Sequence, residues 1–200
     1  MPTASGNTFQ GIHREGGNTM AWEELYAVWF RKLFNYGRKF SPDEGLIEDV
    51  IQDIFLTLWQ QGSLEVRSPD SYLFTAFRNN LLRKIKLDRG KQLESLSDEY
   101  DFHIELSPDQ LMIRNERRNE NHRKISHALA TLTSRQREFI FLKYYQQLSY
   151  QEIAEIMDIS AKAVYKLAAR AIQLLRRELE SEQCMLIALV LCSPPPSGNR

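Results

Sequence analysis

Apolar residues recur at helical spacing through most of the chain. Residues 22–40 predict the first helix, whose apolar positions share one face, as in an amphipathic helix. These positions are Leu25, Val28, Trp29, Leu33 and Tyr36. Ser41-Pro42-Asp43 ends this pattern and begins the next helix, with proline near its first turn.

The second helix has the clearest amphipathic pattern in the chain. Its apolar positions are Val50, Ile51, Ile54, Phe55, Leu58 and Trp59. Residues 62–69 predict a loop, and a third helix follows over residues 70–89. We expect that helix to bury Leu73, Phe77, Leu81 and Ile85.

A second group of helices is predicted from residue 117 to residue 182. Two capping boxes mark helix starts there, one of Thr133 with Gln136 and one of Ser149 with Glu152. Residues 92–116 have weak periodicity and many acids, which predicts a linker. No stretch alternates as a strand would. The pattern therefore predicts an all-α protein with two small helical domains joined by an acidic linker.

The ends of the chain differ from its middle. Residues 1–19 are rich in Gly, Thr, Asn and Ser, which predicts a disordered lead, and Met20 is a candidate start. Residues 183–200 form an apolar and Pro-rich tail whose apolar run, 184–192, is too short to span a bilayer. The two cysteines lie in this tail and suggest neither a disulfide framework nor zinc. We expect a cytoplasmic protein without metal or cofactor and without stable membrane insertion.

Charge is segregated along the chain, although 26 basic and 26 acidic residues cancel. Residues 78–91 and 160–177 are basic, and residues 92–113 between them are acidic without Lys or Arg. Two basic blocks favour two contacts with a polyanion such as nucleic acid. Ordinary solvated helix faces are the alternative.

Residues 151–170 fit a helix-turn-helix. Ile153, Ala154 and Met157 form the inner face of the first helix, and Ala154 must be small where the two helices cross. Asp158 occupies a turn position that favours positive φ and usually holds Gly, and Asp tolerates that geometry better than most residues. Ser160 is the expected N-cap of the second helix, which buries Val164 and Leu167.

The outward face of that second helix is basic and fits the major groove. We expect the lysines of this face to bond guanine, Tyr165 to stack or to reach a phosphate, and Arg176 and Arg177 further along to meet phosphates. The candidate DNA-binding residues are Lys162, Tyr165, Lys166, Arg170 and Arg176. A three-helix bundle with a basic exterior is the alternative.

A polar stripe lies opposite the apolar face of residues 48–60. It consists of Asp49, Gln52, Asp53 and Leu56, spaced i, i+3, i+4 and i+7. Acids around one exposed leucine are typical of a protein-docking surface. By itself the stripe would fit an ordinary solvated face better.

Taken together, the two halves resemble the extracytoplasmic-function (ECF) subgroup of bacterial RNA polymerase sigma factors. EDVIQDIFLTLWQ (48–60) resembles the polymerase-binding helix and SYLFTAFRNNLLRKIK (71–86) the promoter-melting helix of that family. Residues 132–179 resemble its reader of the upstream promoter element. The family usually has Gly or Pro near position 162 and a basic residue near 167, where this chain has Lys162 and Leu167.

The resemblance implies a region 2-like domain over 20–91 and a region 4-like helix-turn-helix domain over 117–182. It implies a factor that initiates transcription, binding core RNA polymerase through its beta-prime clamp helices, promoter DNA at the −35 and −10 elements, and an anti-sigma factor. The stripe would dock on the polymerase. The expected contacts to the melted downstream element are Arg67, Tyr72, Phe74, Arg78, Asn79, Arg83 and Lys84. A core position for Phe74 is an equal alternative.

Two other functions remain as alternatives. A stand-alone helix-turn-helix regulator would bind DNA without polymerase. An enzyme has little support, because the chain has no phosphate-cradling Gly loop and its four histidines are scattered. We therefore expect no catalytic residues.

Overall fold

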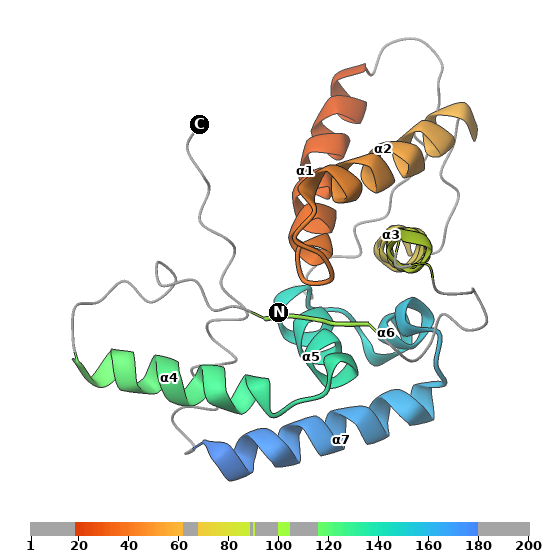
Figure 1. The fold of residues 1–200 in the computed structure, drawn as a ribbon. Helices are drawn as coiled ribbons and strands as arrows, with labels where there is room; N and C mark the ends of the chain where they lie inside the picture. The colour runs from red at the N-terminus through yellow and green to blue at the C-terminus, as the bar shows by residue number, and fades with distance from the viewer. Residues whose placement is uncertain (1–18, 62–67, 89, 91–99, 105–115, 180–200) are drawn as a thin grey trace, which may run out of the picture. The chain divides into compact units, whose positions relative to one another are not determined.

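A computed structural model describes residues 19–61, 68–88, 90, 100–104 and 116–179 (Figure 1). Within these ranges the chain forms seven α-helices and one π-helix and no strand. It divides into two compact units, residues 1–99 and 100–200. The all-α class and the division into two helical parts are therefore confirmed. None of the described helices is both long and apolar enough to cross a membrane.

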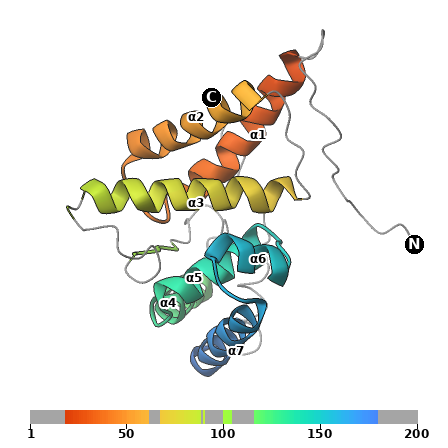
Figure 2. The same ribbon diagram turned by 90° about the vertical axis from the view of Figure 1, so that its right-hand side faces the viewer.

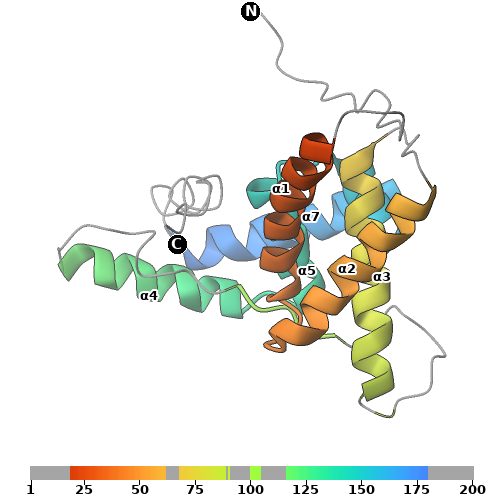
Figure 3. The ribbon, with the colours of Figure 1, turned by 90° about the horizontal axis from the view of Figure 1, so that it is seen from above.

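The first unit contains α1 (Thr19–Gly37), α2 (Glu44–Gln61) and α3 (Pro69–Asp88), which pack against one another (Figures 2 and 3). The centre of its core is aromatic. The ring of Tyr36 lies edge-on to Phe40 and to Phe74, with centroids 5.0 Å and 5.3 Å apart. Burying these large rings supplies much of the apolar area that holds three helices together.

The end of α1 approaches the other two helices closely because residue 37 is a glycine. A Cβ atom at Gly37 would lie 2.7 Å from Cγ2 of Ile47 and 2.8 Å from Cζ of Phe77. Asp43 then caps α2, its Oδ1 accepting a 3.0 Å hydrogen bond from the backbone N–H of Leu46. The predicted break at residues 41–43 thus contains the N-cap of α2, whereas α1 already ends at Gly37.

Two apolar residues of the predicted helix faces are exposed. Val28 on α1 and Trp59 on α2 were expected to belong to the buried stripes, but 52% and 43% of their surfaces are accessible. The three-helix core is too narrow to cover these positions at the edges of the apolar faces.

The second unit contains α4 (Glu116–Ala130), α5 (Ser134–Ile140), the π-helix η2 (Phe141–Tyr145), α6 (Tyr150–Met157) and α7 (Ala161–Glu178). The long α7 packs on α4, α5 and α6. Both predicted capping boxes are present, at Thr133 with Gln136 and at Ser149 with Glu152. Each satisfies two backbone donors at a helix start, so α5 and α6 begin where the sequence predicts.

A π-helical turn, which the sequence analysis did not anticipate, follows α5. The N–H of Gln146 bonds the carbonyl of Phe141 at 3.1 Å, five residues back, and Gln147 then takes a left-handed φ of 58°. Burial raises the pKa of the Tyr145 phenol in this turn. The widened turn redirects the chain from α5 toward α6.

Residues 100–104 belong to the second unit, although the sequence predicted a linker over 92–116. Phe102 is fully buried, with its ring edge-on to Phe141 at 5.8 Å. Its carbonyl accepts a 2.6 Å hydrogen bond from Nε of Arg137, and the Tyr100 hydroxyl donates to the buried carboxylate of Glu138. The predicted lead (1–19) lies outside the described residues except for Thr19, which begins α1, and the tail (183–200) lies wholly outside them.

Candidate nucleic-acid interface

A left-handed turn separates α6 from α7. Asp158 takes φ 53° and ψ 51°, the geometry that the sequence predicted for this position. Ser160 is the N-cap of α7, and its hydroxyl accepts a hydrogen bond from the N–H of Ala163 at 3.2 Å. These two local features set the direction of α7 as it leaves the turn.

The two helices pack through small and apolar residues. Ile153, Ala154 and Met157 are buried on α6, and Val164 is buried on α7. Leu167, expected on the same inner face, is half-buried. The predicted helix-turn-helix packing is therefore present, and it leaves the opposite face of α7 uncovered.

That uncovered face carries the five predicted DNA-binding residues. Lys162, Tyr165, Lys166, Arg170 and Arg176 are all exposed. The neighbouring Arg177 pairs with Glu178 at 3.0 Å, whereas residues 161–177 contain no acid. The outward face of α7 is consequently a basic surface available to a polyanion.

Tyr165 is both exposed and held in place. It is 60% exposed, yet its ring stacks on that of Tyr150, with 4.6 Å between centroids and 6° between planes. Nζ of Lys143 lies 5.2 Å from the centroid of the Tyr150 ring. Tyr150 and Lys143 were not predicted from the sequence. The spacing of residues along the chain does not show that two rings fifteen positions apart are in contact.

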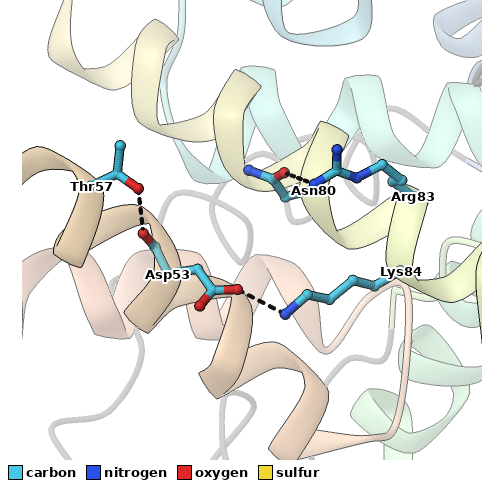
Figure 4. A network of polar contacts seen from close by, with 5 residues as sticks. All are labelled: Asp53, Thr57, Asn80, Arg83 and Lys84. Carbon is cyan, nitrogen blue, oxygen red and sulfur yellow. Dashed lines mark hydrogen bonds and ion pairs between the residues drawn. The ribbon is translucent and has the colours of Figure 1, made fainter.

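The predicted stripe on α2 is exposed at all four positions, Asp49, Gln52, Asp53 and Leu56. Leu56 is the most accessible large apolar residue among those that the structure describes in the first unit, at 59%. Asp53 accepts a 2.9 Å hydrogen bond from Nζ of Lys84 on α3 (Figure 4). Thr57 donates to the backbone carbonyl of Asp53 at 2.8 Å, one turn along the helix.

Basic and polar side chains of α3 lie near this ion pair. Arg83 is exposed and donates to the side chain of Asn80 at 3.0 Å (Figure 4). Tyr72 is exposed at the start of α3, and Asn79 is half-buried. Of the predicted contacts to a melted strand, Tyr72, Asn79, Arg83 and Lys84 are at least partly accessible.

Two residues of that predicted set, Phe74 and Arg78, are buried, and for Phe74 this is the core position that the sequence left as an equal alternative. Phe74 is fully buried between Trp29 and Tyr36, with ring centroids 5.9 Å and 5.3 Å away. Only 3% of Arg78 is exposed. Neither side chain can reach a nucleic acid without unpacking the core. Arg67 lies outside the described residues.

Two family models match the chain and together cover more than half of it. The model for sigma-70 region 2 matches residues 25–90, which contain most of α1 and all of α2 and α3. The model for sigma-70 region 4 matches residues 122–175, which contain the helix-turn-helix. The order of the two matches along the chain is that of the two structural units.

Curated proteins that match this chain over most of their own length are also similar to it in sequence. The RNA polymerase sigma-E factor of Streptomyces avermitilis is 25% identical over 167 residues, covering 82% of this chain and 88% of that protein. The ECF RNA polymerase sigma factor SigX of Bacillus subtilis is 28% identical over 163 residues, covering 78% and 82%.

A solved structure shares the fold. It is the sigma factor RpoE of Bartonella quintana, crystallised with the anti-sigma factor NepR. It superposes with a TM-score of 0.55 at 20% identity and covers 82% of this chain and 99% of that chain. With a region 2 unit, a region 4 helix-turn-helix and relatives of this kind, the chain belongs to the sigma-70 family as an ECF sigma factor, which binds core RNA polymerase, recognises promoter DNA and initiates transcription.

Proposed function

We propose that the three exposed surfaces described above divide the work of promoter recognition among them. The outward face of α7 reads the upstream element as duplex, the exposed side of α3 holds the melted strand, and the stripe on α2 docks on polymerase. The observation that carries the proposal is the acid-free face of α7, aimed by the turn at Asp158 and the cap at Ser160.

In the upstream contact, distance along α7 separates two roles. Lys162, Tyr165 and Lys166 lie in the first two turns, where side chains of an inserted helix meet base edges. Arg176 lies fourteen residues after Lys162, or about 21 Å along the axis at the usual rise. We assign Arg170 and Arg176 to phosphates, which position the helix without reading sequence.

In the downstream contact, Arg83 and Lys84 supply the charge that a separated strand needs. Tyr72 adds an exposed ring on which an unpaired base can stack, and Asn79 adds a polar group on the same helix. This set excludes Phe74 and Arg78, which are buried.

In the polymerase contact, the stripe of Asp49, Gln52, Asp53 and Leu56 meets the clamp helices of the beta-prime subunit. Its support is an exposed leucine within an acidic surface, since one apolar anchor ringed by charge is typical of a protein-docking site.

The domain limits that go with these roles are residues 20–91 for region 2 and 117–182 for region 4, with an acidic linker between them. We extend region 4 by the segment 100–104, because Phe102 is part of its core. The protein performs no chemistry of its own, and it acts in the cytoplasm, where polymerase and DNA are found.

An anti-sigma factor is a further partner in this proposal. The solved RpoE of similar fold is bound to one. Several large apolar residues of the first unit are exposed and offer area for such a partner, among them Val28, Leu56, Trp59 and Tyr72.

Reconstituted holoenzyme tests the reading role of α7. A variant with Lys162, Lys166 and Arg170 changed to alanine should bind core polymerase as the wild type does, and it should lose selective binding to a promoter that the wild-type holoenzyme selects from a random pool. Equal promoter binding by the two proteins would contradict the proposal. Tight binding of the free chain to a palindrome as a dimer would favour the stand-alone regulator instead.

A further inference from the structure

Tyr165 occupies an unusual position for an exposed aromatic residue. It lies on the outward face of α7 between two lysines, Lys162 and Lys166, and 60% of its surface is accessible. An exposed tyrosine ordinarily samples several rotamers and loses that freedom on binding. Here the parallel stack on Tyr150, 4.6 Å away, restricts the ring before any ligand arrives.

The stack is anchored in the core of the second unit. The ring of Tyr150 also contacts that of Phe139, which is fully buried, with 5.9 Å between centroids. On the exposed side, the ammonium of Lys143 lies 5.2 Å from the Tyr150 ring and donates a 3.0 Å hydrogen bond to the carbonyl of Leu148. A continuous series of rings therefore runs from Phe139 through Tyr150 to Tyr165.

The chemistry of duplex DNA narrows what such a ring can meet. In the major groove the bases are stacked, so their faces are covered and only their edges are accessible. The donors and acceptors of these edges suit polar side chains, and the C5 methyl group of thymine is the apolar feature of the groove floor. A ring fixed on the reading face of α7 is therefore suited to contact the methyl group of a thymine.

We propose that Tyr165 reads a thymine methyl group in the upstream element and that Tyr150 is the positioning residue that holds the Tyr165 ring for this contact. The inference rests on the proposed reading role of α7 and adds to it the kind of base that one position recognises. The phenol hydroxyl of Tyr165 is not needed for the contact.

The test uses the upstream element that the wild-type holoenzyme selects from a random pool. Each thymine of that element is replaced in turn by deoxyuridine, which removes only the methyl group. We expect one thymine whose replacement weakens holoenzyme binding about fourfold, the size expected for one buried carbon group. Five proteins are compared with the wild type, namely Tyr165→Phe, Tyr165→Ala, Tyr150→Leu, Tyr150→Phe and Gln173→Ala.

Tyr165→Phe and the control Gln173→Ala, an exposed position on the same helix, should keep the methyl effect. Tyr165→Ala should abolish it. Tyr150→Leu keeps an apolar side chain but no ring, and it should reduce the methyl effect while leaving affinity for the deoxyuridine promoter unchanged. Tyr150→Phe, which retains the stack, should restore the effect. Circular dichroism checks that each variant is folded.

Three results would overturn the inference. The first is a selected element in which no thymine is sensitive to loss of its methyl group. The second is a methyl effect that persists in Tyr165→Ala or that is lost in Tyr165→Phe. A loss in Tyr165→Phe would mean that the hydroxyl is needed, as in a phosphate contact. The third is an equal loss on both promoters in Tyr150→Leu, which would give Tyr150 a purely structural role. A different result would contradict the proposed reading role of α7 itself. That result is a set of base-pair changes in the upstream element that leave holoenzyme binding unaltered.

Discussion

Lys84 on α3 donates a hydrogen bond to the carboxylate of Asp53 on α2, with 2.9 Å between Nζ and Oδ2 (Figure 4). The pair joins the stripe proposed to dock on polymerase to the side of α3 proposed to hold DNA. An exposed ion pair contributes only about 0–1 kcal/mol to stability, so breaking this pair should change the free energy of unfolding little. Substitutions here therefore test binding rather than folding.

The docking stripe is tested by a double substitution. Asp53→Arg with Leu56→Ala reverses one charge and removes the exposed apolar side chain, so affinity for core polymerase should fall at least tenfold, about 1.4 kcal/mol. The matched control is Leu87→Ala with Asp88→Arg, because Leu87 is 55% exposed and Asp88 is exposed on α3. Equal core affinity for the two double variants, measured by pull-down without DNA, would remove the stripe from the docking site.

The burial of Arg78 predicts an effect on stability. Arg78→Met removes a buried guanidinium and leaves its polar partners unsatisfied, which should lower the free energy of unfolding by about 2–4 kcal/mol. Arg83→Met, on the exposed side of α3, should change it by less than about 0.5 kcal/mol. The three tryptophans, Trp22, Trp29 and Trp59, all lie in the first unit, so tryptophan fluorescence during urea unfolding reports on that unit. A stable Arg78→Met variant with weakened DNA binding would restore the original interpretation of Arg78.

Two basic residues of α7 should differ in what they contact. Lys166→Ala should relax preference at one or two base pairs of the upstream element, since a base contact contributes roughly 1–3 kcal/mol. Arg176→Ala should weaken all sequences alike and reduce the salt slope of binding by about one unit. Holoenzyme binding to a panel of element variants at several salt concentrations separates the two. A uniform loss in Lys166→Ala would make that lysine a phosphate contact.

The turn of the helix-turn-helix should tolerate glycine better than alanine. Asp158 has φ 53°, which glycine adopts without strain. Asp158→Gly should therefore leave stability within about 1 kcal/mol of the wild type. Asp158→Ala should be roughly 1–2 kcal/mol less stable than Asp158→Gly, because alanine has a Cβ that meets the carbonyl in this geometry and glycine has none. Thermal unfolding followed by circular dichroism measures both. An alanine variant more stable than the glycine variant would argue against the left-handed turn.

The attachment of residues 100–104 can be tested at its most buried side chain. Phe102→Ala should destabilise the second unit by about 3–5 kcal/mol, as expected for a large aromatic removed from a core. His103→Ala, at the exposed neighbouring position, is the control and should have little effect. Hydrogen exchange at backbone amides of α5 and α7 reports on this unit alone. Unaltered exchange in Phe102→Ala would mean that the segment is not part of the core.

Features set by neighbouring residues were predicted well from the sequence. The capping boxes at Thr133 and Ser149 and the left-handed Asp158 are all present. Each depends on contacts within about four residues, so the local sequence contains the information. The helix-turn-helix and its outward basic face followed from the same kind of spacing.

Features set by packing between distant segments were not predicted correctly. Arg78 lies in a basic stretch and was taken for a surface residue, but the position of α3 against its neighbours buries it. Val28 and Trp59 lie at the edges of apolar stripes, where the width of the core decides exposure. The stack of Tyr150 on Tyr165 joins two helices, and its rings are too far apart in the sequence for any periodicity to show.

The burial of Phe102 has a consequence for how the protein can be divided. The region 4 family model begins at residue 122, yet the core of the second unit includes a residue twenty positions earlier. A fragment cut at the start of the family match would uncover Phe141 and deprive Arg137 of the Phe102 carbonyl. A fragment that keeps this core intact therefore has to start before Tyr100, because the family match is shorter than the packed unit.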